Sequence, residues 1–335
     1  MSGPEPSTME AGEPDREELE RAILGAKPEL TAQQVADAAG ITREEAKRLW
    51  RALGFPDAGD AVAFTQDDLQ ALRLVHLAVE RADLDIETAT RLTRAVGNAM
   101  ARLADWQVST LAEHAEDHTG GAGSRLASTL GLSQSVAPAF ERLLVYAWRR
   151  HLAAAVSRLE TWGGAAEEDL LNADITVGFA DLVAFTQLTN RLDDDALASL
   201  VESFETRCAD IVTGRGGRVI KTLGDSILFV AEPPVEAVEI ALSVVEEIGP
   251  DADLPDVRIG LATGTVITRF GDVFGPPVNL AARLTTVARR NRVICDPSTA
   301  EALPEDGYDT RALPPRPLRG FGSIEPVTVR RRWSY

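Results

Sequence analysis

The spacing of apolar residues divides the chain into a helical half and a half in which strands alternate with helices. From residue 16 to residue 162, apolar residues recur every three or four positions, which is the period of an amphipathic helix. Thr31, Thr42 and Thr65 stand where N-caps belong, and Gly40 stands where a helix would end. We therefore predict an all-α domain over residues 16–162, with helices over residues 18–24, 31–40, 42–50, 65–81, 86–106, 108–118 and 136–162.

Beyond residue 172 the apolar period shortens to two within short runs, which indicates strands between helices. The order is β-α-β-β-α-β with additions, and it predicts a ferredoxin-like α+β domain over residues 173–335. In such a sheet the first and third strands are neighbours. The expected elements are strands 175–182, 257–263 and 292–296, a hairpin 218–230, and helices 193–213, 234–248 and 278–288.

Two segments are predicted to belong to neither domain. Residues 1–15 are rich in proline, glycine and acidic residues, and they carry too little apolar surface to become ordered, so we expect a disordered tail. Residues 163–172 begin with a glycine pair and continue with an acidic stretch, which is typical of a linker between domains. This linker is the candidate switch between the two halves.

Composition is consistent with two domains and restricts the partners. A chain of 335 residues with 44% hydrophobic residues can build two separate cores. The formal net charge of −18 repels polyphosphate, so we expect no nucleic-acid partner, and a bound nucleotide must be held by local cations and metal ions.

Cysteine use and hydropathy indicate the compartment. Cys208 and Cys295 are too few for a disulfide framework and lack metal-ligand spacing, which favours free thiols in a reducing cytoplasm. No apolar run approaches the roughly 18 residues that would span a bilayer, and the acidic start lacks the features of a signal peptide. We expect a cytoplasmic protein without a transmembrane segment.

The first candidate site is a pair of carboxylates. Asp181 ends the strand 175–182, and Asp225 lies in the Leu-Gly-Asp-Ser turn of the hairpin 218–230. If strand and hairpin are neighbours in one sheet, the two aspartates meet at one edge and can bind divalent cations, as two-metal phosphoryl transfer requires. The alternative is two solvated carboxylates at strand ends.

Four further polar residues accompany this pair. Lys221 precedes Asp225 in the hairpin, and Asp272 lies in a turn that leads into the helix 278–288. Asn279 and Arg283 are four positions apart, so they face the same way on that helix. The alternatives are a surface lysine on an edge strand, a turn-forming aspartate, a capping asparagine and a surface arginine.

Taken together, the stretches around Asp181, Asp225 and Asp272 resemble the catalytic domain of class III nucleotidyl cyclases. The resemblance implies an adenylate cyclase that converts ATP to 3′,5′-cyclic AMP and pyrophosphate, with two Mg²⁺ or Mn²⁺ ions on Asp181 and Asp225. It assigns Lys221 and Asp272 to the adenine base.

The resemblance also implies roles around the sugar and the phosphates. Asn279 would orient the ribose, and Arg283 would stabilise charge developing on the phosphoryl group. The segment from Leu182 through Phe185 to Thr186 would offer backbone N–H groups to the β- and γ-phosphates. Arg319, in Leu-Arg-Gly-Phe-Gly, stands where the family usually has a phosphate-binding lysine.

In this family the metal-binding aspartates come from one subunit and the base-binding and transition-state residues from its partner. This chain carries both sets, so the resemblance implies a head-to-tail homodimer with two equivalent active sites.

The helical half is similar, more loosely, to the regulatory domains of two-domain cyclases from mycobacteria and related actinobacteria, some of which respond to acid and carry a lipid-binding helical domain. All four histidines lie in this half: His76, His114, His118 and His151. Because histidine titrates near neutrality, mild acidification would add charge mainly there. A pH response, a lipid or small-molecule ligand, and a plain core without regulation all remain open.

A rival hypothesis starts from residues 31–51, whose two short helices and glycine turn match a helix-turn-helix. Arg43, Lys47, Arg48 and Arg51 would lie on or near its second helix. In this alternative the protein is a transcription regulator with a degenerate cyclase domain as nucleotide sensor.

Overall fold

The computed structural model describes residues 21–119, 125–162, 172–269 and 271–332. The chain divides into two compact units, Met1–Ala153 and Ala154–Tyr335, which we treat separately. The division falls within a continuous helix rather than at a break in the backbone. The predicted tail 1–15 lies outside the described residues, as does the predicted linker except for Asn172, where a strand begins.

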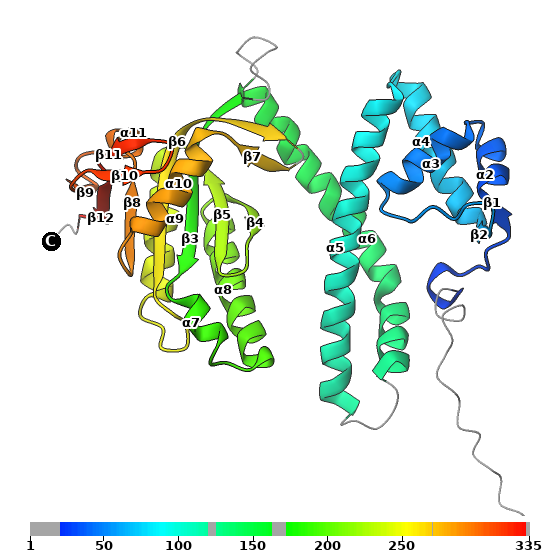
Figure 1. Ribbon diagram of the computed structural model, residues 1–335, viewed down its shortest axis with the longest axis horizontal. Helices are drawn as coiled ribbons and strands as arrows, with labels where there is room; N and C mark the ends of the chain where they lie inside the picture. The colour runs from blue at the N-terminus through cyan, green and yellow to red at the C-terminus, as the bar shows by residue number, and fades with distance from the viewer. Residues whose placement is uncertain (1–20, 120–124, 163–171, 270, 333–335) are drawn as a thin grey trace, which may run out of the picture. The chain divides into compact units, whose positions relative to one another are not determined.

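The first unit is built of helices α2 (Ala32–Ala39), α3 (Arg43–Ala52), α4 (Gln66–Ala82) and α5 (Ile86–Thr119), together with most of α6 (Arg125–Trp162) (Figure 1). The predicted caps are confirmed, because Thr31, Thr42 and Thr65 each accept a hydrogen bond from the third helical N–H within a capping box. Gly40 ends α2 with φ 75°, a left-handed conformation that glycine adopts without strain.

Three details of this unit differ from the prediction. The two helices expected over 86–106 and 108–118 form the single helix α5, because no glycine or proline separates them. Helix α6 begins at Arg125, well before the expected start at residue 136. It contains Pro138 within its length. Strands β1 (Leu30–Thr31) and β2 (Val62–Phe64) form an unpredicted antiparallel ladder, too short to show a hydrophobic period.

The second unit contains one large sheet with the strand order β4-β5-β3-β6-β8-β12-β9, and β7 pairs with β6. Its strands are β3 (Asn172–Leu182), β4 (Arg218–Thr222), β5 (Ser226–Ala231), β6 (Val257–Arg269), β7 (Asp272–Phe274), β8 (Arg292–Cys295), β9 (Tyr308–Ala312) and β12 (Val327–Arg331). Strands β10 (Arg316–Leu318) and β11 (Gly322–Ile324) form a separate hairpin. The first and third strands of the predicted order are β3 and β5, and they are antiparallel neighbours, which confirms that prediction.

Helices cover both faces of this sheet. Helices α8 (Asp194–Gly214) and α9 (Pro234–Ile248) pack on one face, and α10 (Pro276–Val287) packs on the other (Figure 1). The short helices α7 (Phe185–Thr189) and α11 (Pro297–Glu301) lie in connections. Together with the helical first unit, this sheet confirms the predicted fold class. Strands β9 to β12 were not predicted individually.

Gly260 of β6 allows α10 to lie directly on the sheet. A Cβ atom at this position would come within 2.4 Å of the Thr285 backbone nitrogen and 2.5 Å of the Ala281 carbonyl oxygen. No side chain fits between these two backbones. The close approach fixes the position of α10 against β6.

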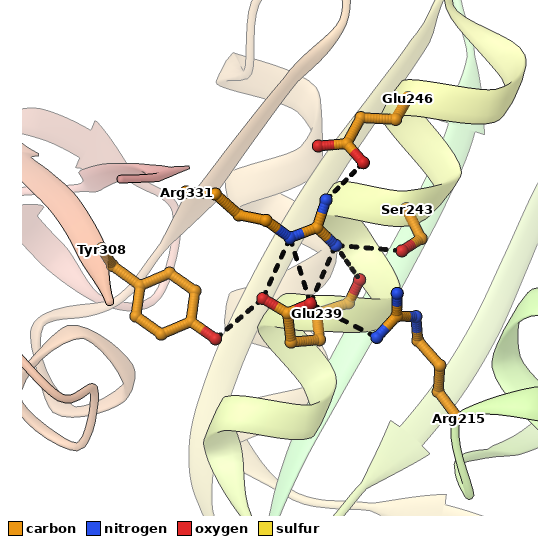
Figure 2. Close-up of polar contacts among 6 residues, drawn as sticks. All are labelled: Arg215, Glu239, Ser243, Glu246, Tyr308 and Arg331. Carbon is orange, nitrogen blue, oxygen red and sulfur yellow. Dashed lines mark hydrogen bonds and ion pairs between the residues drawn. The ribbon is translucent and has the colours of Figure 1, made fainter. Parts of the chain in front are cut away.

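A polar cluster joins the far edge of the sheet to α9 (Figure 2). The Arg331 guanidinium donates to Glu239 Oε2 at 2.8 Å and to Ser243 Oγ at 3.1 Å, and it also pairs with Glu246. The Tyr308 hydroxyl donates to Glu239 Oε1 at 2.8 Å. Because Arg331 lies in β12 and Tyr308 in β9, these contacts tie two strands to one helix.

None of the helices in the described part of the chain combines the length and apolarity needed to cross a bilayer. Cys208 and Cys295 are both buried and free of disulfides, in agreement with the prediction of ordinary thiols. Burial raises the pKa of Cys208 to about 12, so this thiol stays protonated near neutral pH.

Candidate active site

The two aspartates lie at the same end of neighbouring strands. Asp181 of β3 is directly opposite Ser226, which begins β5 and follows Asp225 in the turn. The backbone N–H of Leu182 donates to the Asp225 carbonyl oxygen at 3.0 Å, which fixes the turn against the end of β3. The sheet therefore brings Asp181 and Asp225 together at one edge.

Electrostatics indicate that this edge suits a cation. Burial and, after it, the negative charge of Asp181 raise the pKa of Asp225, because both effects disfavour the ionised carboxylate. A divalent cation between the two groups would remove this repulsion. The described residues contain no cluster of three or more His, Cys, Asp or Glu side chains placed for a metal. Two carboxylates with water and substrate phosphate are, however, a usual donor set for Mg²⁺, so Asp181 and Asp225 fit the expected ions.

Arg258 of β6 is a site residue that the sequence analysis missed. It is directly opposite Asp181 on the other side of β3, and its Nε donates to Asp181 Oδ2 at 2.7 Å. Asp181 Oδ1 also accepts a hydrogen bond from Ser226 Oγ. Arg258 is 77 residues from Asp181 in the chain and belongs to no short motif, so only the register of β3 and β6 reveals it. Its guanidinium places a positive charge next to the carboxylate pair.

Lys221 and Asp272 form a second pair. Lys221 Nζ lies 2.5 Å from Asp272 Oδ2, although the residues are 51 positions apart and come from β4 and β7. Asp272 Oδ1 also accepts from the backbone N–H of Val273 at 2.8 Å, which holds the carboxylate in place. The two side chains are 37% and 27% exposed, so an ammonium donor and a carboxylate acceptor lie side by side within reach of a ligand.

One residue of each pair, Asp181 and Lys221, belongs to the same face of the sheet. Directly opposite residues of antiparallel strands share a face, as do residues two apart in one strand. Asp181 is opposite Ser226, and Lys221 is opposite Leu228, which shares a face with Ser226. Leu228 belongs to the apolar cluster that includes Ala281 and Leu284 of α10, so this is the α10 face.

Helix α10 carries the next two candidates. Asn279 and Arg283 are exposed and lie one turn apart on α10, and Asn279 Nδ2 is 3.5 Å from the Gly275 carbonyl oxygen. Within the described residues, neither side chain forms a hydrogen bond or ion pair with Asp181 or Lys221. Within a single chain, therefore, no described hydrogen bond or ion pair connects Asn279 or Arg283 to the carboxylate pair.

Of the expected phosphate-binding residues, Leu182 is buried, whereas Phe185, Thr186 and Arg319 lie where a ligand could reach them. Leu182 is 1% exposed and its N–H is already bonded to Asp225, so its backbone supports the site rather than facing a ligand. Phe185 and Thr186 occupy the first turn of α7, whose N–H groups have no partner within the helix, and Ala184 provides no side-chain cap. Arg319 is exposed in the turn between β10 and β11.

The predicted helix-turn-helix is present as α2 and α3, but three of its four predicted cations are engaged in ion pairs, and the fourth, Arg48, is exposed. Lys47 Nζ lies 2.5 Å from Asp57 Oδ2, and Arg51 lies 3.3 Å from the same oxygen. Arg43 pairs with Asp60. The loop after α3 thus supplies two carboxylates that weaken the positive field a DNA-binding surface needs.

Comparisons with known proteins show the family to which the chain belongs. Residues 170–330 match the family model described as the Adenylate and Guanylate cyclase catalytic domain. The chain is 40% identical to a protein named adenylate cyclase from Streptomyces coelicolor, over 98% of this chain and 93% of that one. It is 42% identical to an adenylate cyclase of Streptomyces griseus, over 86% and 72% of the two chains. A pH-sensitive adenylate cyclase of Mycobacterium tuberculosis is 30% identical, over 90% and 78%.

The match to the family model identifies residues 170–330 as a nucleotidyl cyclase catalytic domain. Since the similarity to the Streptomyces coelicolor protein covers nearly the whole of both chains, this chain belongs to the adenylate cyclase branch of the class III cyclase family.

Proposed function

We propose that the protein converts ATP to 3′,5′-cyclic AMP and pyrophosphate, with Mg²⁺ or Mn²⁺ on Asp181 and Asp225, at sites completed between two copies of the chain. One observation carries this proposal: Asp181, which lies beside the Asp225 turn, and Lys221, which pairs with Asp272, belong to the same face of one sheet. The relatives named adenylate cyclase support the choice of product.

In the proposed reaction the ribose 3′ oxygen bonds to the α-phosphorus while the bond from that phosphorus to the departing pyrophosphate breaks. Asp181 and Asp225 would hold two divalent ions, which favour ionisation of the 3′ hydroxyl and neutralise the triphosphate. Asn279 orients the ribose, and Arg283 stabilises charge on the transferring phosphoryl group. The N–H groups of Phe185 and Thr186, together with Arg319, bind the β- and γ-phosphates.

Base recognition follows from the donor and acceptor at the Lys221–Asp272 pair. The Lys221 ammonium donates to adenine N1, and the Asp272 carboxylate accepts from the adenine N6 amino group. Guanine presents the opposite pattern at these positions, an acceptor at O6 and a donor at N1, so it would leave both protein groups badly paired. The existing contact of 2.5 Å keeps the two groups side by side before the base binds.

The homodimer is inferred from two features of the single chain: residues of the proposed site that do not contact one another, and large apolar side chains that are exposed. Asn279 and Arg283 do not contact the carboxylate pair within the chain, so a second copy must supply them. Large apolar side chains at the β4–β5 turn and on the β6–β7 hairpin are also exposed, namely Leu223 at 49%, Ile267 at 45% and Phe274 at 49%. Burial of these side chains against a second chain would stabilise such a dimer.

The activity is tested by incubating the purified chain with Mn²⁺ and either ATP or GTP, followed by chromatographic identification of the products. We expect cyclic AMP from ATP, little cyclic GMP, and no product from Asp225→Ala, which should remain folded because Asp225 lies in a surface turn. Asp210→Ala, on α8, is the matched control and should keep full activity. Failure to form cyclic AMP under these conditions would reject the assignment.

We further infer that the first unit regulates the second. The similarity to the pH-sensitive relative extends over 90% of this chain, beyond the catalytic unit. Of the four histidines, His76 Nε2 lies 3.4 Å from Glu80 Oε1 on α4, whereas the side chain of His118 lies outside the described part of the structure. A lipid ligand remains a proposal without a site.

The regulatory proposal is tested by comparing the full chain with a fragment that starts at Leu170, across about pH 5.5 to 8. Regulation by the first unit predicts different pH profiles or specific activities. Identical profiles and specific activities would show that the helical unit neither senses acid nor restrains the reaction. The expected site of this reaction is the cytoplasm, which supplies ATP and keeps Cys208 and Cys295 reduced.

A further inference from the structure

Ser226 begins β5 directly after Asp225, and its hydroxyl donates a hydrogen bond to Asp181 Oδ1. We propose that Ser226 is a positioning residue, which holds the Asp181 carboxylate in the orientation that a divalent cation binds. The inference rests on the proposed function, because it takes Asp181 as a metal ligand. It deepens that function by naming the group that orients the ligand.

The register of the sheet places Ser226 within reach of Asp181. The two residues are directly opposite each other in the antiparallel pair of β3 and β5, so their side chains project from the same face. The backbone of Ser226 is also fixed from the turn, because the Leu223 N–H donates to its carbonyl oxygen at 2.7 Å. A short side chain on a fixed backbone loses little conformational entropy when it forms this hydrogen bond.

Both carboxylate oxygens of Asp181 have a protein donor. Ser226 Oγ donates to Oδ1, and Arg258 Nε donates to Oδ2 at 2.7 Å from the strand on the other side of β3. The Asp181 side chain is 14% exposed, so little water competes for these contacts. An ionised carboxylate has about four acceptor positions, so each oxygen retains room for a cation. The two donors therefore fix the orientation of the carboxylate without saturating it.

Ser226 and Arg258 differ in charge, which separates their effects on a metal ion. The Arg258 guanidinium repels a nearby divalent cation, whereas the Ser226 hydroxyl is neutral. Replacing Arg258 would therefore combine a lost hydrogen bond with a relieved repulsion. Replacing Ser226 removes the orienting hydrogen bond alone, so this residue gives the cleaner test.

The second carboxylate lacks this support. Within the described parts of the chain, the Asp225 carboxylate accepts a hydrogen bond from its own backbone N–H and from no side chain. Asp225 can thus rotate to suit a cation, whereas Asp181 presents oxygens in a fixed orientation. Because an oriented ligand loses less side-chain entropy when a metal binds, the orientation of Asp181 should contribute strongly to metal affinity.

The test measures Mn²⁺ binding to the full chain separately from turnover. Electron paramagnetic resonance distinguishes free from bound Mn²⁺, and 3′-deoxy-ATP serves as the nucleotide because it lacks the oxygen that would attack the α-phosphorus. A protein-free sample gives the metal that the nucleotide alone binds. We expect Ser226→Ala to weaken binding to the protein by about 10-fold or more, as is usual when a group that orients a metal ligand is removed. Ser226→Thr keeps the hydroxyl and should restore most of the affinity.

Steady-state kinetics give a second readout. A bound cation holds Asp181 by itself, so at saturating Mn²⁺ the kcat of Ser226→Ala should approach that of the unmodified chain. The Mn²⁺ concentration for half the maximal rate should rise about 10-fold. A purely structural role would instead lower the melting temperature and leave that concentration unchanged.

Ser199→Ala is the matched control, because it removes an exposed hydroxyl that donates to the Asp195 carbonyl oxygen at 2.9 Å on α8. It should change neither Mn²⁺ affinity nor kinetics. Circular dichroism checks that each variant folds.

Three results would overturn the proposal. One is Mn²⁺ affinity that Ser226→Ala leaves unchanged, another is equally weak binding by folded Ser226→Ala and Ser226→Thr, and the third is no protein-bound Mn²⁺ in the unmodified chain. Failure of the proposed function is distinguishable from these results. Formation of cyclic AMP by the unmodified chain tests that function alone, whereas the Mn²⁺ affinity of Ser226→Ala tests the role of Ser226.

Discussion

Lys221 and Asp272 neutralise each other across β4 and β7, and this pairing explains how two groups of opposite charge remain half-buried before a base binds. When a nucleotide base offers an acceptor to Lys221 and a donor to Asp272, hydrogen bonds to the base replace the contact between the two side chains, and both groups keep a partner. A base with the reversed pattern leaves a partly desolvated charge unpaired, which costs far more than one ordinary hydrogen bond.

Replacing this pair should change substrate choice more than stability. Lys221→Glu combined with Asp272→Cys is expected to lower kcat/KM for ATP by at least about 100-fold, because both hydrogen bonds to adenine are lost. The melting temperature should move little, since the side chains are 37% and 27% exposed. Steady-state kinetics with ATP and GTP check this, and equal turnover of both nucleotides by the unmodified protein would contradict the base assignment.

Some residues of the candidate site can be predicted from the sequence and others cannot, and the difference has a physical reason. Asp225 and Lys221 belong to one local hairpin, so their spacing along the chain already reflects their spacing in space. Arg258 reaches Asp181 only because β6 pairs with β3 in one particular register. Such a register depends on packing of the whole sheet, which no local pattern specifies.

Among the elements, α10 is held in place by its contact with β6 at Gly260. A methyl group at that position meets backbone atoms of α10 at 2.4 to 2.5 Å, and backbone cannot move aside as a flexible side chain can. Since α10 carries Asn279 and Arg283, its position matters for the proposed site as well as for the core.

Gly260→Ala should therefore destabilise the protein by roughly 1 to 3 kcal/mol and reduce activity at temperatures where the chain is still folded. Urea unfolding and activity assays measure the two effects. Gly307→Ala is the matched control, because a methyl group there meets only Pro304 at 3.7 Å. Equal stability of the two variants would contradict the close packing of α10.

The cluster around Arg331 gives a second prediction for the elements, shown in Figure 2. Burial alone would raise the pKa of Glu239, but hydrogen bonds from Arg331 and Tyr308 outweigh it and lower that pKa below its ordinary value. An acid whose pKa is lower in the folded state stabilises the fold above its unfolded pKa, and loses this contribution as pH falls through the folded pKa.

Arg331→Met should cost roughly 2 to 3 kcal/mol at pH 7, because it leaves a charged acceptor short of donors. The difference from the unmodified protein should begin to shrink as pH falls below the ordinary glutamate pKa of about 4.5, and it should disappear as pH falls through the lower pKa of Glu239 in the folded protein. Urea unfolding at pH 7 and at acidic pH checks this. Arg332→Met is the control, since its ion pair with Asp309 is exposed and should contribute less than about 1 kcal/mol. A constant difference at every pH would contradict the account.

Longer elements were predicted more accurately than short ones. Helices α8 and α9 have continuous apolar stripes, and the predicted ranges agree with the structure within a residue. Strands of two or three residues, such as β1, β2, β10 and β11, are too short to show a period and form because a partner strand is present. The merger of two predicted helices into α5 has a related cause, since continuous packing overrides a weak local change in pattern.

For the whole molecule, the change in hydrophobic period predicts two domains, whereas the division between the two compact units falls inside α6 rather than at its end. A helix that continues through a boundary leaves no mark in composition. The proposed dimer is likewise a property of two chains. Within one chain, Asn279 and Arg283 form no described hydrogen bond or ion pair with the aspartates proposed to bind metal ions, which is why a single copy is expected to be inactive.

The most direct test of this account mixes two inactive variants, Asp181→Ala and Asn279→Ala, after each has been shown to fold. A heterodimer contains one site in which both defects coincide and one site that is intact. Equal mixing should therefore restore roughly a quarter of the unmodified rate of cyclic AMP formation. If the mixture stays as inactive as its components although chromatography shows that heterodimers form, the site is not shared between two chains and the account is wrong.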